Sequence, residues 1–294
     1  MTPPEKRRPL DLQQRSRLAG EASAAAAEVE RELATPADPT AAAFFDVDNT
    51  MMQGASIFHM ARGLHRRDFF TTRDILSAAW KQTYFRVVGV EDPEHVAKAR
   101  ASALSFITGH SVEELQGLSE EIFEESMAQR IWPGTRALAQ LHLEEGQRVW
   151  LVTAAPIEIA QVIARRLGLT GALGTVAEHE NGVYTGRLVG DLLHGPAKGE
   201  AIKALAALEG LDLARCSAYS DSFNDLTMLS LVGHAVAINP DSRLRGYAKQ
   251  HGWQIRDYRT GRKAARVGLL TAATAGAVAG AAAAGTAAVR RRHR

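Results

Sequence analysis

The stretch Ala41-Ala42-Ala43-Phe44-Phe45-Asp46-Val47-Asp48-Asn49-Thr50 joins an apolar run to two acids spaced two apart. The apolar part, Ala41 to Phe45, predicts a buried β-strand that ends where the acids begin. Because residues two apart in an extended chain point to the same side, Asp46 and Asp48 can face one small volume. Two carboxylates there repel unless a cation or a proton intervenes. The pair therefore suits a magnesium site in which one acid attacks and the other transfers a proton.

Two further stretches place polar residues at the ends of predicted elements. Arg148 to Val152 predicts a second buried strand that ends at Thr153, whose hydroxyl could hold a phosphoryl oxygen together with the backbone N–H of Ala154. Lys198 opens the predicted helix from Gly199 to Leu208, near the positive end of its dipole.

A third predicted strand, Cys216 to Ser220, leads into Ser220-Asp221-Ser222-Phe223-Asn224-Asp225, just before a helical run from Leu226 to Val232. Each downstream piece has an ordinary alternative: an N-cap for Thr153, a surface lysine for Lys198, and capping or first-turn acids for Asp221 and Asp225. The pieces occur in one order and all lie at the ends of strands or helices. That arrangement favours a single shared site.

With these motifs in place, the chain resembles the haloacid dehalogenase (HAD) superfamily, and within it subfamily IB, the phosphoserine-phosphatase-like branch. The resemblance extends from about Ala41 to Tyr258. The residues that carry it are Phe45 to Thr50, Thr153, Lys198-Gly199, Ser220 to Leu226, and a hairpin-like stretch from Glu180 to Gly186.

The resemblance implies a mechanism for the two acids of the first motif. Asp46 would be the nucleophile that forms an aspartyl-phosphate intermediate. Asp48 would be the general acid and base, which first protonates the leaving oxygen and then deprotonates the attacking water. Mg²⁺ would be held by the Asp46 carboxylate, the Asp48 backbone carbonyl and Asp221.

The resemblance also implies roles for the later motifs. Thr153, Lys198 and Asn224 would bind the phosphoryl group, with Lys198 offsetting the negative charge of acids and phosphate. Asp225 would help to hold these groups in place without contacting the phosphoryl group itself.

Two positions depart from the family pattern. Thr153 is followed by Ala154-Ala155-Pro156 in place of a Gly-rich turn, and Pro156 has no backbone N–H to donate. Ala55 stands, by count, where phosphoserine phosphatases carry a glutamate that reads the amino group of serine. The second departure argues against phosphoserine as the substrate.

Strands alternate with helices through the main part of the chain, and His234 to Ile238 and Trp253 to Ile255 predict two more strands. This alternation predicts an α/β fold with a doubly wound parallel sheet, which corresponds to the Rossmann-like core of the HAD resemblance. We expect the core at 41–54 and 133–258.

The insert at 55–132 is expected to be an all-helical cap placed over the carboxyl edge of the sheet. Its predicted helices are Ser56 to Arg67, Thr72 to Phe85, Pro93 to Ile107 and Ser111 to Gln129. Ser111 and Glu114 are spaced as a capping box at the start of the last helix.

Composition excludes several classes of protein. The formal net charge of +2 gives no global basic field for nucleic acid. The single cysteine, Cys216, excludes a disulfide framework within the chain and suggests a reducing cytoplasm. Residues 1–40 predict a flexible Ala/Glu-rich arm, and its acids argue against a signal peptide.

The tail at 259–294 contains an uncharged stretch, 267–289, with basic residues on both sides. We expect an Ala/Gly-rich helix there. It is long enough to span a bilayer, although alanine and glycine contribute little to insertion. The expectation is a cytoplasmic protein, and a membrane tether through 267–289 is weighed equally against a soluble tail.

The leading hypothesis is a magnesium-dependent phosphomonoester phosphatase acting on a small phosphorylated metabolite or a lipid phosphate. Two alternatives remain open: a phosphotransferase using the same intermediate, and a membrane-tethered, non-catalytic binding protein. The presence of Asp46, Asp48, Lys198, Asp221 and Asp225 together favours an enzyme, because a binding protein has no need of all five.

Overall fold

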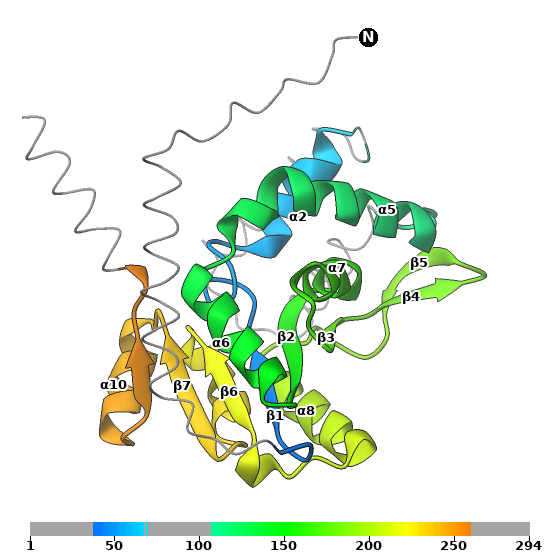
Figure 1. The fold of residues 1–294 in the computed structure, drawn as a ribbon. Helices are drawn as coiled ribbons and strands as arrows, with labels where there is room; N and C mark the ends of the chain where they lie inside the picture. The colour runs from blue at the N-terminus through cyan, green and yellow to red at the C-terminus, as the bar shows by residue number, and fades with distance from the viewer. Residues whose placement is uncertain (1–37, 68, 70–106, 260–294) are drawn as a thin grey trace, which may run out of the picture. The chain divides into compact units, whose positions relative to one another are not determined.

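A computed structural model describes residues 38–67, 69 and 107–259 (Figure 1). Its central sheet has six strands in the order β3-β2-β1-β6-β7-β8. All pairings among β3, β2, β1, β6 and β7 are parallel. The strands are β1 (Ala42–Phe45), β2 (Arg148–Pro156), β3 (Gly171–Thr175), β6 (Ser217–Ser220), β7 (His234–Ile238) and β8 (Gln254–Arg256). The predicted doubly wound α/β fold is confirmed.

Successive residues of β1 face opposite sides of the sheet, and helices cover both sides. Phe44 packs with residues of α8 (Pro196–Glu209), α9 (Leu226–Leu229) and α10 (Ser242–Gln250). On the other face, the Phe45 ring stacks on Tyr219 of β6 and meets the edge of His142 in α6 (Pro133–Glu144). Because both faces are covered, β1 is apolar throughout and buried.

The chain order places a switch point at β1. From β1 the chain passes through the helical insert to β2 on one side, then through α7 (Ile157–Leu167) to β3, and later reaches β6 on the other side of β1. A short 3₁₀ turn, Leu213–Arg215, precedes β6. Crevices form at the carboxyl ends of the strands at such points, which is where the first and last motifs lie.

The insert begins with α2 (Ser56–His65), and α5 (Val112–Ile122) lies near its end. The predicted helix Ser111 to Gln129 is in fact α5 followed by a π-helical turn, Phe123–Met127, and a 3₁₀ turn, Ala128–Arg130. The predicted helix Thr72 to Phe85 and nearly all of Pro93 to Ile107 lie outside the described residues.

The predicted capping box is half formed. The Ser111 hydroxyl accepts a hydrogen bond from the Glu114 backbone N–H at 3.0 Å. The Glu114 carboxylate contacts His110 at 3.2 Å, since that ring is the nearer partner on the preceding turn.

The predicted hairpin is present as β4 (Ala177–Glu180) and β5 (Val183–Leu188), which pair antiparallel. Its turn residues, Asn181 and Gly182, both have positive φ, as a tight two-residue hairpin turn requires.

Two predicted boundaries are wrong. β2 was expected to end at Thr153 but continues to Pro156, with a register shift against β3 between Val152 and Pro156. The helical run predicted from Leu226 to Val232 stops at Leu229, after a 3₁₀ turn at Phe223–Asp225.

Within 38–67, 69 and 107–259, no helix is long and apolar enough to cross a membrane. The stretch 267–289, the expected terminal helix and nearly all of the arm at 1–40 lie outside these ranges.

Candidate active site

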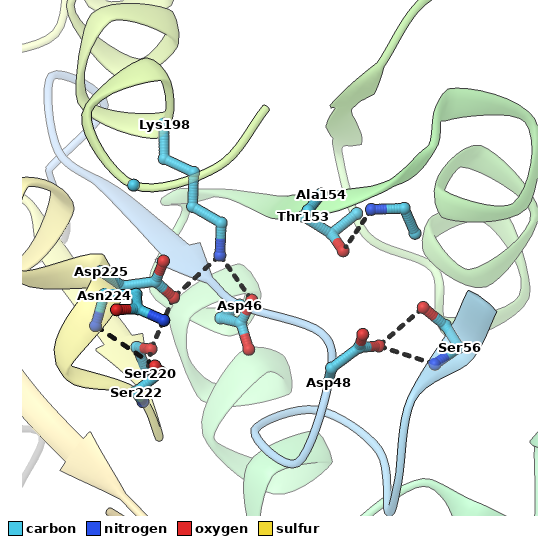
Figure 2. A network of polar contacts seen from close by, with 12 residues as sticks. Asp46, Asp48, Ser56, Thr153, Ala154, Lys198, Ser220, Ser222, Asn224 and Asp225 are labelled. Carbon is cyan, nitrogen blue, oxygen red and sulfur yellow. Dashed lines mark hydrogen bonds and ion pairs between the residues drawn. The ribbon is translucent and has the colours of Figure 1, made fainter. Parts of the chain in front are cut away.

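A buried lysine joins two buried acids at the carboxyl end of the sheet (Figure 2). The Lys198 Nζ lies 2.6 Å from Asp46 Oδ1 and 2.8 Å from Asp225 Oδ2. Asp46 directly follows β1, Lys198 lies in the first turn of α8, and Asp225 ends the turn before α9. The exposed fractions of the three residues are only 6%, 3% and 2%. Asp46 and Asp225, which lie 152 and 27 positions from Lys198 in the sequence, therefore share one buried cluster with it.

The cluster contains one ammonium group between two carboxyl groups, and burial acts on both kinds of group. Burial raises the pKa of Asp46 to about 8, against the opposing effect of Lys198, and Asp225 and Asp221 add to the increase. Burial alone would lower the pKa of Lys198, but Asp46 and Asp225 together hold it above its usual value. The lysine is therefore charged, whereas burial disfavours the ionised form of Asp46 even beside this cation. A second cation would favour the carboxylate form of Asp46.

Asp48 is held by the first residue of α2. Its Oδ1 accepts hydrogen bonds from the Ser56 backbone N–H at 2.8 Å and from the Ser56 hydroxyl at 2.6 Å. The loop between them turns at Asn49 and Gly54, which both have positive φ and are bonded to each other. The insert thus begins with a residue that orients the second acid.

Thr153 is buried and lies within β2, next to β1 in the sheet. Its hydroxyl oxygen accepts a hydrogen bond from the Ala155 backbone N–H at 3.1 Å, so that hydroxyl proton is available to donate. The helix N-cap is Pro156, which excludes the alternative that Thr153 caps α7. In Figure 2, Thr153 and Asp48 face the same region as Asp46.

The last motif contributes its residues unequally. Ser220 donates from its hydroxyl to Asp225 Oδ2 at 2.7 Å and is fully buried. Asp221 is half-buried, and burial followed by repulsion from Asp225 raises its pKa to about 7. Asn224 is exposed, and its described bond is that of its backbone N–H to the Ser222 hydroxyl. The structure brings Asp225 into the lysine cluster and leaves the Asn224 side chain outside it.

Three supporting residues were missed by reasoning from the sequence. Ser56 orients Asp48, and Ser220 bonds to Asp225. Asp241 accepts from the Phe223 N–H at 2.9 Å and donates its own N–H to the Asp221 carbonyl at 2.8 Å. For Asp241 the only signal was its place as a turn acid before a helix.

The donor set suits a hard cation. Among the described residues, no three His, Cys, Asp or Glu side chains gather as ligands of one ion. The predicted magnesium set requires only the carboxylates of Asp46 and Asp221 with a backbone carbonyl of Asp48. These are all oxygen donors, which Mg²⁺ prefers while retaining several waters. The raised pKa of Asp46 agrees with the same ion, because a second cation would favour its carboxylate form.

Comparisons with known proteins indicate one family of hydrolases. Residues 43–230 match the family of haloacid dehalogenase-like hydrolases. The chain is 59% identical over 249 residues to phosphoserine phosphatase SerB1 of Mycobacterium tuberculosis, covering 85% of this chain and 81% of that protein. It is 28% identical to a histidinol-phosphatase of Neisseria meningitidis, covering 74% and 98%.

A solved structure of a Bordetella pertussis protein of unknown function superposes with a TM-score of 0.65 at 28% identity, covering 74% of this chain and 97% of that one. The family match spans more than half of the chain, and it includes most of β1, the lysine and the last acid motif. The chain belongs to the haloacid dehalogenase-like hydrolases and is a phosphatase of that family, similar to the phosphoserine phosphatases.

Proposed function

We propose that the protein is a magnesium-dependent phosphomonoester phosphatase that works through an aspartyl-phosphate on Asp46. The observation that carries the proposal is the buried contact of Asp46 with Lys198 at the switch point of the sheet. A carboxylate in this position is held by a cation on one side while its second oxygen remains available to attack.

In the first half of the reaction, an Asp46 oxygen attacks phosphorus and the bond from phosphorus to the leaving oxygen breaks. Asp48 gives its proton to that oxygen, and Ser56 holds the Asp48 carboxylate in place by two hydrogen bonds. Thr153 and Lys198 provide a hydroxyl donor and a positive charge for the phosphoryl oxygens.

In the second half, Asp48 removes a proton from a water that attacks the phosphorus of the aspartyl-phosphate. The bond between phosphorus and Asp46 breaks, and inorganic phosphate leaves. Asp46, Asp221 and the Asp48 carbonyl would hold Mg²⁺, which supplies positive charge to the phosphoryl group. We further propose that residues 55–132 form a cap over this site and that 41–54 and 133–258 form the catalytic core.

The first test is phosphate release from a panel of phosphomonoesters, with and without Mg²⁺. Asp46→Asn is expected to lower kcat by at least about a thousandfold, because it removes the nucleophile while keeping the shape of the side chain. Asp212→Asn is a control, since Asp212 only caps a 3₁₀ turn away from the site.

Normal turnover by folded Asp46→Asn would refute the proposed nucleophile. Release of phosphate without any added acceptor distinguishes a phosphatase from a phosphotransferase. Phosphoserine belongs in the panel because a similar protein is a phosphoserine phosphatase. Ala55, the N-cap of α2, nevertheless offers no carboxylate for an amino group.

A further inference from the structure

A cavity of about 370 Å³ adjoins the candidate phosphoryl site. Ala154 and Pro156, which follow Thr153 on β2, form part of its wall. Ile57 lies next to Ser56 at the start of α2 and also lines it. The two elements that orient Thr153 and Asp48 therefore continue directly into the cavity.

Most of the remaining wall is apolar. It is formed by the cap helices α2 and α5 and by the β4–β5 hairpin, through Met60, Leu64, Leu115, Ala177 and Leu188. The volume of the cavity falls within the range of roughly 300–1,000 Å³ that is common for ligand pockets. A cavity lined in this way holds water poorly, which favours an apolar occupant.

The two polar residues in the wall, Thr175 and Glu158, already form hydrogen bonds within the protein. The Thr175 hydroxyl donates to the Ala154 carbonyl at 2.8 Å and accepts from the Leu193 N–H at 3.0 Å. Glu158 accepts from the Tyr184 hydroxyl at 2.7 Å, and both residues are buried. Within the described residues, the lining contains no cation.

Several basic residues from the described part of the insert gather elsewhere. A separate polar pocket of about 180 Å³ shares no described lining residue with the apolar cavity, and it is lined in part by His59, Arg62, Arg66 and Arg130. A carboxylate placed in the apolar cavity would thus lose its hydration without gaining a charged partner, which is costly.

We propose that the cavity holds a hydrocarbon portion of the leaving group. The substrate would then be a phosphomonoester whose alcohol carries an apolar chain or ring close to the ester oxygen. This inference rests on the proposed function, because it takes the phosphoryl group to lie at Asp46 and Thr153. It distinguishes this chain from an enzyme that selects the ammonium and carboxylate of phosphoserine.

The experiment compares n-alkyl phosphates from ethyl to octyl, below their micelle concentrations, with phenyl phosphate and phosphoserine. We expect kcat/KM to rise about two- to fourfold for each added methylene until the cavity is full, as expected for burial of a CH₂ group. Comparing kcat/KM for phenyl phosphate with that for hexyl phosphate then shows whether the cavity prefers a ring or a chain. A preference for either one agrees with the proposal.

Two neighbouring residues provide a matched pair of variants. Ile57 lines the cavity and Phe58 does not, yet both are exposed hydrophobic residues of α2, at 46% and 60%. Ile57→Asn is expected to lower kcat/KM for hexyl phosphate about five- to tenfold, with less than about a twofold change for ethyl phosphate. Phe58→Asn is expected to leave both unchanged.

Calorimetric binding of n-alkylphosphonates, which cannot be hydrolysed, makes the test independent of catalysis. If no monoester is hydrolysed but phosphonate affinity rises with chain length, the function fails and the cavity assignment stands. A flat dependence on chain length in both measurements, or a preference for phosphoserine over every alkyl ester, would overturn the inference.

Discussion

Lys198 is the residue on which the charge arrangement of the site depends. Its ammonium bridges two carboxylates that are otherwise distant in sequence, and all three groups are buried. A buried ion pair contributes little net stability compared with apolar residues of the same shape, but removal of one partner leaves the other uncompensated. The lysine is therefore needed for the fold as well as for the proposed chemistry.

Lys198→Met is expected to destabilise the protein by about 3–5 kcal/mol at pH 7.5, because Asp46 and Asp225 lose their shared cation. Without it, the folded-state pKa of Asp46, which burial already raises to about 8, rises further above its unfolded value. Stability lost in this way is recovered as the pH falls and Asp46 takes up a proton, so the deficit should shrink towards pH 5. Denaturant unfolding at both pH values measures this.

Lys203→Met is the matched control for this variant. Lys203 lies on the same helix and pairs with Glu200 at 2.9 Å, but both side chains are well exposed. Its loss should cost under about 1 kcal/mol at either pH. Equal effects of the two substitutions would contradict the argument from burial.

Two helices of the insert approach closely at a glycine. A Cβ added to Gly63 of α2 would lie 2.4 Å from the Ile122 side chain of α5, and Ile122 is almost fully buried. The close contact explains a glycine in a helix interior, where it otherwise weakens the helix.

Gly63→Ala is expected to destabilise the protein by about 1–3 kcal/mol through overpacking against Ile122. Gly117→Ala, on α5 with nothing within 4 Å of the added Cβ, should instead stabilise it by roughly 0.5–1 kcal/mol through helix propensity. Thermal unfolding of both variants gives the comparison. Stabilisation by both substitutions would show that the helices do not pack as described.

The sheet and α6 are joined at the centre of the molecule by a buried histidine. His142 contacts the Gln147 side-chain oxygen at 2.6 Å and the Tyr219 hydroxyl at 2.7 Å. Burial lowers the pKa of His142 to about 4, with Gln147 opposing the shift and His234 adding to it. The ring is therefore neutral in the folded protein at every pH where the enzyme is expected to work.

This histidine predicts acid sensitivity of the whole fold. Between pH 6.5 and pH 4 the unfolded chain binds a proton at His142 that the folded chain does not. Stability should therefore fall as the pH drops through this window, by up to about 3 kcal/mol from this residue, and level off below it. The measurement is denaturant unfolding of wild type and His142→Gln from pH 7.5 to 3.5.

The quantity to compare is the difference in free energy of unfolding between wild type and His142→Gln, because other titratable groups contribute equally to both proteins. This difference should shrink as the pH falls from 6.5 to 4. Only the wild type has a buried histidine that must stay neutral in the folded state, so only the wild type loses stability from this residue. A difference that stays constant over the window would exclude a buried, neutral His142.

Much of the core could be predicted from local sequence. Apolar runs ending in acids, a threonine or a serine mark buried parallel strands, because such strands are covered on both faces and meet ligands at one edge. Asn181-Gly182 indicates its turn through backbone geometry alone. These features depend on neighbours in the chain, so β1, β6, β7, the hairpin and α8 lie close to their predicted positions.

The contacts that set the chemistry depended on tertiary structure. Asp225 rather than Asn224 reaches Lys198, because a 3₁₀ turn between β6 and α9 directs it inward. Ser56 meets Asp48 only because the loop after β1 folds back through Asn49 and Gly54. The apolar cavity combines residues from two strands of the sheet, the hairpin and the helices α2 and α5, which no local pattern relates. Sequence periodicity indicates which residues are buried, whereas packing between distant segments decides which buried groups meet.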